Sequence, residues 1–337
     1  MNITFDQARR FGFTFPDARA WIGSNKAALA RDAALVTTPN SGVPVEFTAF
    51  IDPQVVEILT APRNARRLFD EEKKGDWTTS FDKFQVTEMV GGTEEYSDYA
   101  NGVTSDVNAN WMSRAQYLFQ TAITYGDREV ALSSMARIDL AAAKQRAAAT
   151  KIDIDANRFY LTGVEGLEIY GIFNDPNLPS AITAGATGTG GSTMWADKTT
   201  KGIYDDILAL FAQLQAQTEG LVTEQDKLKL CLSPAMNAYL GSATDFNINV
   251  KKMLDSYFAQ LEIVVFPELA ALDGEQTLFL IAPEVTGQKS GTLAFGEKIR
   301  AGRVIPDLSS FRQKFIGSTY GGIVYIPAAF ASMTGLA

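Results

Sequence analysis

Residues 185–192, GATGTGGS, combine residue types that could bind a phosphate group. A phosphate-binding loop follows the pattern G-x-x-x-x-G-K-[S/T], in which backbone N–H groups surround the phosphate and the lysine reaches its outer oxygens. Gly185, Gly190 and Ser192 fit this spacing, but Gly191 takes the place of the lysine. The preceding residues, PNLPSAIT, lack the pattern of the buried strand that such a loop follows. We therefore interpret the segment as a hinge-like connection and expect no nucleotide turnover.

Two pairs of acidic residues have the chemistry of a hard-metal site. Asp153 and Asp155 form one pair, and Asp205 and Asp206 form the other. Ca²⁺ and Mg²⁺ prefer carboxylate oxygens, but neither pair lies in a calcium-binding loop with its glycine and terminal glutamate. Solvated helix faces account for both pairs, and neither is recognisable as an acid–base dyad. The sequence therefore indicates no catalytic, cofactor-binding or metal-binding residue.

The chain contains no histidine, which narrows the possible chemistry further. Histidine is the side chain whose pKa suits proton transfer near neutrality, and it is the commonest zinc and copper ligand. Cys231 is the only cysteine, so an intrachain disulfide and a thiolate metal cluster are excluded. Its surroundings, LKLCL, favour the role of a small buried hydrophobic residue. Carboxylate pairs and Ser-Lys arrangements remain possible, so composition alone does not exclude an enzyme.

Length and composition indicate a globular protein. The 337 residues permit one elaborate domain or two ordinary ones, with 46% hydrophobic and 20% charged residues. The net charge of −9 argues against a general nucleic-acid binder that needs many phosphate contacts. It suits a protein that faces a polyanion without gripping it. No apolar run is long enough to cross a bilayer, and the first residues lack the pattern of a secretory signal.

The first half of the chain predicts an arm, a long ribbon and a long helix. Residues 53–59 are expected to be a short helix opened by proline. Residues 77–90 and 111–125 have the pattern of two extended arms, joined by the acidic tip GGTEEYSDYANG. Such a ribbon is marginally stable alone and should rest on another element. The alanine-rich stretch from Arg128 to about Asn157 contains no proline or glycine and predicts one helix capped by Asp127.

The second half has a clear α/β pattern. Ile203, Ile207, Leu210, Phe211 and Leu214 form one helical stripe that ends near Gly220. Apolar runs at 228–232, 261–266 and 278–282 predict buried strands, Ser233-Pro234 predicts a helix start, and 250–258 a further helix. The remainder, 291–337, is again strand-like. We expect a discontinuous architecture in which the α/β region is inserted into a first domain, with the glycine-rich loop at the crossing.

Three short passages, in this order along the chain, resemble those of one protein family. They are LTG at 161–163 followed by GIFNDP at 171–176, LCLSPA at 230–235, and GGIVYIPAA at 321–329. Together with the order of elements, they are similar to the major capsid proteins of tailed double-stranded DNA phages, which have the Hong Kong ninety-seven fold. The resemblance covers nearly the whole chain. It implies an α+β fold with these parts: an N-terminal arm (1–50), the start of a peripheral domain (51–75), an extended β-ribbon loop (76–125), a spine helix with more of the peripheral domain (126–185), an axial α/β domain (186–290) and peripheral return strands (291–337).

The resemblance also implies a function and partners. The expected function is a structural subunit, not an enzyme, that self-assembles into hexamers and pentamers of an icosahedral head around double-stranded DNA. Expected partners are further copies of the chain, a separate scaffold, a portal, possible decoration proteins, and packaged DNA without sequence-specific binding; no membrane or cofactor is expected. Assembly is expected in the cytoplasm of the host bacterium. Some relatives are crosslinked through lysine and asparagine, but only Lys83 has a matching place on the ribbon, and we interpret it as solvated.

Intersubunit contacts are expected at two charged groups and at ribbon aromatics. The acidic tip, defined by Glu94, Glu95 and Asp98, could meet the basic cluster of another subunit, defined by Arg63, Arg66 and Arg67. Hydration of both groups is the alternative. The aromatic candidates are Trp77, Phe81 and Phe84. Two other functions remain open at this point: an encapsulin-like compartment shell, and a histidine-free hydrolase or nucleotide-binding protein.

Overall fold

The structure is a computed structural model that describes residues 63–96, 98, 102–135, 139–242, 249–272 and 274–336. All of these residues belong to one compact unit, Ile58–Ala337. The expected N-terminal arm and the expected helix at 53–59 lie outside the described residues. Within the described part of the chain, no helix is both long and apolar enough to cross a membrane.

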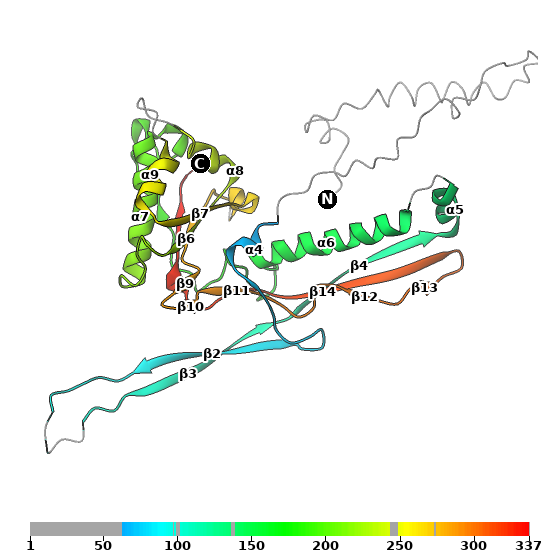
Figure 1. Cartoon of the computed structure of the whole chain (residues 1–337), viewed down its shortest axis with the longest axis horizontal. Helices are drawn as coiled ribbons and strands as arrows, with labels where there is room; N and C mark the ends of the chain where they lie inside the picture. The colour runs from blue at the N-terminus through cyan, green and yellow to red at the C-terminus, as the bar shows by residue number, and fades with distance from the viewer. Residues whose placement is uncertain are drawn as a thin grey trace, which may run out of the picture. The chain divides into compact units, whose positions relative to one another are not determined.

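A six-stranded sheet is organised around the 15-residue strand β14 (Figure 1). β14 pairs in antiparallel fashion with β4, β11, β12 and β13, and β1 pairs in parallel with β11. The strands are β1 (Glu71–Lys73), β4 (Tyr117–Gly126), β11 (Gly291–Phe295), β12 (Arg300–Ala301), β13 (Ile305–Pro306) and β14 (Ser310–Val324). The expectation of strands after residue 291 is therefore met by β11 to β14.

The expected single long helix is two helices, α5 (Asp127–Met135) and α6 (Leu140–Thr162). The side chain of Asp139 accepts a hydrogen bond from the Ala142 N–H and so caps the start of α6. Sequence reasoning missed this break because neither glycine nor proline marks it. α6 packs against β14 and β4, where Ile152 contacts a small core with Ile123 and Phe315.

A second, five-stranded sheet has the order β5-β15-β8-β6-β7. Its strands are β5 (Ile182–Thr183), β6 (Lys227–Leu232), β7 (Gln260–Val265), β8 (Leu278–Ile281) and β15 (Phe330–Thr334). Helices α7 (Thr200–Gln217), α8 (Pro234–Tyr239) and α9 (Val250–Tyr257) accompany it. The predicted apolar stripe of α7 is confirmed, because all five of its residues are buried. The Ser233 side chain accepts from the Met236 N–H, so the predicted helix start is confirmed as well.

Two expected boundaries differ from this topology. β15, which was expected among the peripheral return strands, pairs with β8 and β5 in the five-stranded sheet. β5 already belongs to that sheet, so the glycine-rich loop at 185–192 follows the crossing and does not form it. The chain thus enters the five-stranded sheet twice, at β5 and again at its last strand. Strand pairing of this kind cannot be read from the periodicity of a single segment.

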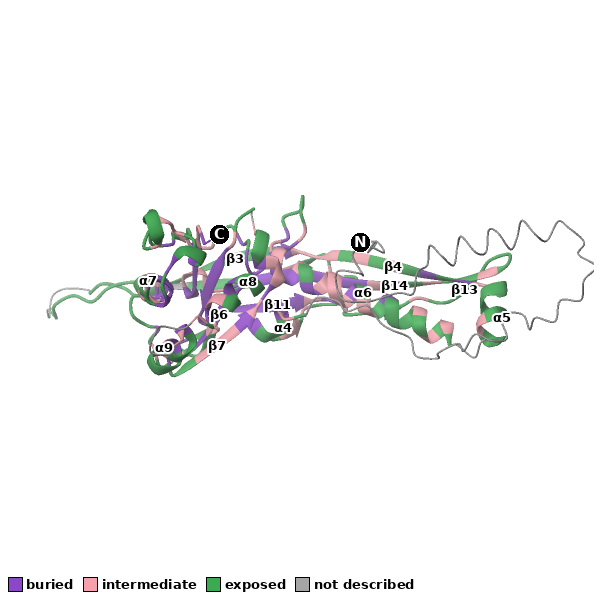
Figure 2. Cartoon of the chain, turned by 90° about the horizontal axis from the view of Figure 1, so that it is seen from above, coloured by how far each residue is buried: buried purple, intermediate pink, exposed green. Residues whose placement is uncertain are grey.

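Short elements complete the described chain. They are α4 (Ala65–Leu68), β9 (Glu284–Val285), β10 (Gln288–Lys289) and the 3-10 turns η1 (Thr189–Gly191), η2 (Trp195–Asp197), η3 (Pro267–Ala271) and η4 (Pro327–Ala329). In Figure 2 the buried residues concentrate around β6 and β11, whereas α5 has none. The core is therefore richest where the five-stranded sheet meets β11 and α4.

The passage after α6 has a defined geometry that explains its glycine-rich sequence. The Asn174 side chain accepts from the Gly171 N–H and donates to the Thr162 carbonyl, which closes the turn onto the end of α6. Gly163 follows the helix with a φ of 68°, and a Cβ there would collide with the Ile169 carbonyl. Only glycine combines this conformation with so close an approach. The sequence pattern at 161–174 is thus a backbone requirement.

Candidate assembly surface

The ribbon consists of β2 (Phe81–Val90) and β3 (Asp106–Ala115), which pair with each other and with no other described strand. Phe81 pairs with Ala115 and Val90 with Asp106, so the ribbon has ten paired positions on each strand. The prediction that residues 111–125 form one return arm of the ribbon is wrong for the second half of this range. β3 ends at Ala115, and β4 leaves the ribbon to pair with β14.

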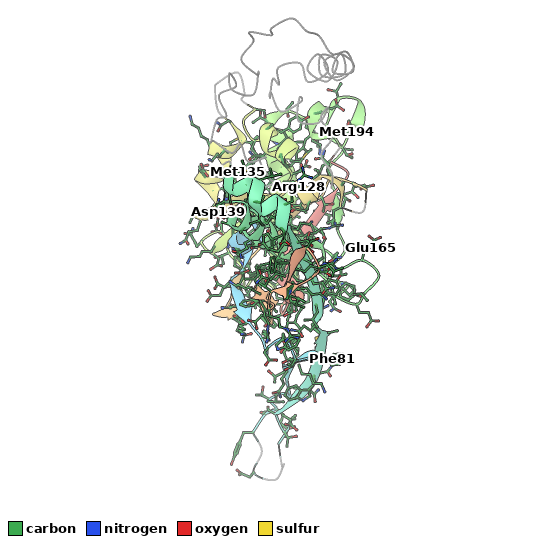
Figure 3. All side chains as sticks on the ribbon, turned by 90° about the vertical axis from the view of Figure 1, so that its right-hand side faces the viewer. Phe81, Arg128, Met135, Asp139, Glu165 and Met194 are labelled. Atoms are coloured by element: carbon green, nitrogen blue, oxygen red, sulfur yellow. The ribbon has the colours of Figure 1, made fainter. Side chains whose placement is uncertain are left out.

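One face of the ribbon presents large aromatic side chains to solvent. Phe81 and Gln85 lie on the same face because their spacing is even, and Gln85 pairs with Trp111. Phe81 is 60% exposed and Trp111 is 63% exposed. Figure 3 shows Phe81 on the ribbon. Aromatic side chains are enriched in protein–protein contact surfaces, so these two positions are candidates for a contact. Sequence reasoning singled out Phe81 but missed Trp111, although the alternation of the strand contained it.

The opposite face of the ribbon is anchored to the rest of the chain at its base. The Phe84 ring meets the Tyr325 ring edge-on, with 5.5 Å between centroids. Arg114 on β3 forms a buried ion pair with Asp175, and its guanidinium lies 5.2 Å from the centre of the Tyr170 ring. These contacts fix the direction in which the ribbon leaves the six-stranded sheet. Phe84 is therefore engaged within its own chain.

Lys74 adds a charged anchor at the same base. Its ammonium donates to the Tyr325 hydroxyl at 2.8 Å and lies 3.4 Å from an Asp82 carboxylate oxygen. Burial alone would lower the pKa of Lys74, but the hydrogen bond to Tyr325 and the attraction of Asp82 outweigh it and raise the pKa. Trp77, the third aromatic candidate, lies under the Arg300 guanidinium at 4.4 Å from the ring centroid. An intersubunit role for Trp77, Phe81 or Phe84 stays a prediction, and Phe81 is the least engaged of the three.

The basic cluster is held by carboxylates of its own chain. Arg63 pairs with Asp153, and Arg66 pairs with Asp153 at 2.7 Å and with Glu71 at 3.0 Å. Arg67 pairs with Glu262 at 2.7 Å. Asp153 on α6 and Glu262 on β7 were not foreseen because they lie far away in sequence, whereas Glu71 on β1 is close to Arg66 along the chain. Asp153, interpreted as part of a solvated helix face, is instead the carboxylate that ties α4 to α6.

Lys229 on β6 also contacts α4, next to the ion pairs of the basic cluster. Its ammonium donates to the carbonyls of Arg67 and Leu68, at the end of α4. Burial lowers the pKa of Lys229, although Glu262 acts in the opposite direction. The α4 segment thus connects α6, the six-stranded sheet and the five-stranded sheet through charged groups.

The acidic tip forms no ion pair with a described residue. Glu94 and Glu95 are exposed, and Asp98 accepts a hydrogen bond from the Tyr96 hydroxyl at 2.7 Å. The structure does not bring the tip and the basic cluster of one chain together in an ion pair among the described residues. Their pairing between subunits therefore stays a prediction. Substitutions in the acidic tip are the suitable test, because they disturb no described ion pair within the same chain.

We expect the double variant Glu94→Lys, Glu95→Lys to assemble with a several-fold lower yield of sedimenting particles than the wild type. The reason is that it would place like charges against the basic cluster of another copy. Adding Arg67→Glu and Glu262→Gln should restore part of the yield, because it lowers the positive charge of the cluster and offers one carboxylate to the tip lysines, without leaving two glutamates face to face. Arg67 is the suitable position, since both members of its ion pair are exposed and the pair is worth only about 0.2–1 kcal/mol. Wild-type yield from the double variant would contradict the pairing.

The glycine-rich loop is fastened by a buried carboxylate. Asp206 on α7 accepts from the Gly185 N–H at 3.0 Å, the Trp195 Nε1 at 2.9 Å and the Lys198 Nζ at 2.5 Å. The interpretation of Asp206 as a solvated helix charge is therefore wrong. Asp205, its neighbour, does lie on an exposed face, paired with Lys201. Asp206 thus holds Gly185 at the start of the glycine-rich loop, and Trp195 and Lys198 just after its end.

The remaining described side chains that could take part in chemistry have structural roles. Cys231 is buried, and burial raises the pKa of its thiol, so the reactive thiolate is disfavoured. Among the described residues, no three acidic or thiol side chains are grouped so that they could hold a metal ion.

A family model described as Pa193 gp26 major capsid protein matches residues 34–335 of the chain. The match covers both sheets, the ribbon and α6. The chain belongs to this family of major capsid proteins. It is therefore a structural protein of the bacteriophage capsid, and the hydrolase and compartment alternatives are not favoured. No curated protein gives a match.

Solved capsid structures have the same fold as this capsid protein. The capsid of Myoviridae phage XM1 matches with a TM-score of 0.73 at 12% identity, covering 88% of this chain and 100% of that one. The capsid of a native GTA particle matches with a TM-score of 0.62 at 12% identity, covering 89% of this chain and 100% of that one. The capsid structure of Mycobacterium phage Che8 matches with a TM-score of 0.54 at 13% identity, covering 90% of this chain and 99% of that one. The α+β fold of the Hong Kong ninety-seven type, expected from the sequence, is thereby confirmed.

Proposed function

We propose that this capsid protein forms hexamers and pentamers that tile a closed icosahedral head around double-stranded DNA. The observation that carries the proposal is the ribbon. Its outer face exposes Phe81 and Trp111, and its base is locked by Arg114 and Phe84. An element that is anchored at its base and exposes aromatic side chains on one face is suited to reach a neighbouring copy and bury these aromatics there.

The partners follow from this geometry and from the charge of the chain. The same ribbon repeated in every copy makes heterologous contacts, which close into rings when the rotation is right. The net charge of −9 suits a wall that encloses DNA without binding it tightly or by sequence. We propose that a separate scaffold and a portal guide closure, because pairwise contacts alone leave the size of the shell open. Decoration proteins on the outside and assembly in the host cytoplasm are part of the same proposal.

We also propose that the protein has no catalytic role. The absence of histidine, the inaccessible thiol and the engagement of Asp206 with Lys198 support this. The loop at 185–192 carries Gly191 where a phosphate-binding loop has lysine, which supports the absence of nucleotide turnover.

Electron microscopy of the purified protein, with nuclease treatment of particles from infected cells, tests the proposal. We expect closed shells from the protein, alone or with a scaffold, and nuclease-protected DNA in the particles from infected cells. Small oligomers under every condition would contradict shell formation. Closed particles that contain protein cargo and no DNA would favour a compartment over a phage head.

A further inference from the structure

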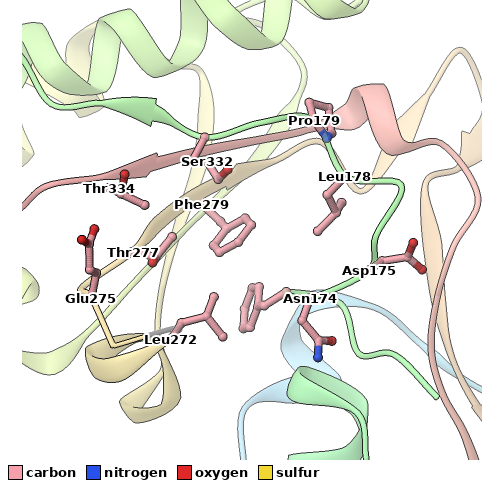
Figure 4. A pocket seen from close by; sticks show the side chains of 12 residues that line it. Asn174, Asp175, Leu178, Pro179, Leu272, Glu275, Thr277, Phe279, Ser332 and Thr334 are labelled. Atoms are coloured by element: carbon pink, nitrogen blue, oxygen red, sulfur yellow. The ribbon is translucent and has the colours of Figure 1, made fainter. Parts of the chain in front are cut away.

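A cavity of about 490 Å³ lies between the five-stranded sheet and residues 173–181 (Figure 4). Its floor is one face of β8 and β15. Ser332 pairs with Phe279 across these strands, and the same register places Thr334 beside Thr277. The residues between them, Leu278 and Met333, point the other way into the core. The cavity therefore lies against a face of the sheet that no described helix covers.

The walls combine an aromatic surface with a carboxylate. The Phe173 ring lies against Phe279, with 4.8 Å between centroids. Glu275 stands at the rim, is exposed, and forms no ion pair with a described residue. Asp175 also lines the cavity, but it is already engaged by Arg114 and by the backbone N–H and the side-chain amide of Asn177. Glu275 is thus the carboxylate of the cavity that is open to a new partner.

The hydroxyl groups of the floor are also open to a partner. Thr277 and Ser332 are buried residues, and their hydroxyls, like that of Thr334, form no hydrogen bond with a described residue. Among the described residues that line the cavity there is no lysine or arginine. A positive group would find a carboxylate at the rim, acceptor oxygens on the floor and two aromatic side chains in the lining. An anion would find no positive charge there.

We propose that this cavity receives a lysine or arginine side chain from a second copy of the chain. The inference rests on the proposed shell, in which every subunit meets further copies through unlike surfaces. Basic side chains without an ion pair among the described residues are available for such a contact. Lys251 and Lys252 on α9 are both exposed, and α9 leads into β7, the edge strand opposite β5. A ring of subunits that brings unlike edges of this sheet together would bring these lysines toward the cavity.

Cysteine labelling of Thr334→Cys measures whether a second copy covers the cavity. Cys231 is fully buried and adds little background. A thiol reagent should label unassembled subunits readily and assembled shells on the order of tenfold more slowly, because occupied pockets bury most of the bound group. Equal labelling in both states would overturn the proposal. Protection already present in unassembled subunits would also overturn it, because residues of the same chain would then fill the cavity.

Charge substitution tests the chemistry independently of the cysteine variant. Glu275→Gln should lower the yield of shells several-fold, whereas Glu224→Gln, on the loop before β6, should leave the yield unchanged. Lys251→Gln with Lys252→Gln should lower the yield in the same way, and a normal yield from this double variant would overturn the assignment of these lysines to the cavity. Wild-type yield from Glu275→Gln would overturn the proposal. If the wild-type protein forms no shells at all, the proposed function fails; if its shells form but leave the cavity open, only this inference fails.

Discussion

Replacing residues 88–108 by a two-residue Asn-Gly turn is expected to give a folded subunit that forms no shells. The turn would join Thr87 to Ala109, which pair across the ribbon, and Asn-Gly has the backbone conformation that a tight hairpin needs. The described side chains that are removed, from Val90 to Val107, are exposed. Their loss costs the subunit little burial, whereas a neighbouring copy would lose the outer part of the ribbon with its acidic tip, although Phe81 and Trp111 remain.

The base of the ribbon must stay for this result to be informative. Phe84 packs on Tyr325, and Arg114 pairs with Asp175, so a deletion that begins before residue 87 would also damage the core. Circular dichroism and gel filtration should show a soluble subunit with its helices intact, and electron microscopy should show no particles. A second variant, Phe81→Ser with Trp111→Ser, keeps the ribbon at full length and should weaken assembly as well. Normal particles from the shortened variant would contradict the role of the ribbon.

Local patterns predicted the five-stranded region well. The stripe of α7, the serine–proline start of α8 and the apolar runs of β6 and β8 each carry their signal within a few residues. These signals arise from burial and capping, which neighbouring residues determine. The resemblance to the capsid family then predicted how these elements are arranged in the fold, which the local signals do not show.

Strand partners and buried charges could not be predicted in the same way. The alternating pattern continues from β3 through Gln116 into β4, although the two strands join different sheets. Periodicity shows that a segment is extended and which side faces inward, but not which strand it pairs with. The partners of the basic cluster are likewise distant in sequence, since Arg67 meets Glu262. An isolated acidic pair in a sequence does not reveal which member is buried.

Asp206→Ala is expected to lower the free energy of unfolding by about 3–5 kcal/mol, because it leaves a buried ammonium without its carboxylate. The side chain of Lys198 is 0% exposed and that of Asp206 is 4% exposed, so water cannot take the place of the missing partner. The Trp195 Nε1 and the Gly185 N–H would lose their acceptor as well. Denaturant unfolding of the unassembled subunit, followed by tryptophan fluorescence, measures the change.

Asp205→Ala is the matched control, since it changes the adjacent residue of the same helix. Asp205 pairs with Lys201 on an exposed face, and exposed pairs of this kind are worth about 0.3–0.5 kcal/mol. The double variant Lys198→Met, Asp206→Leu removes both charges, and it should recover much of the stability that Asp206→Ala loses, because no unpaired charge remains buried. Equal effects of Asp205→Ala and Asp206→Ala would mean that the buried pair does not fasten the loop. A large effect confined to Asp206→Ala would identify residues 185–198 as a fixed part of the five-stranded region, where the sequence alone indicated a hinge.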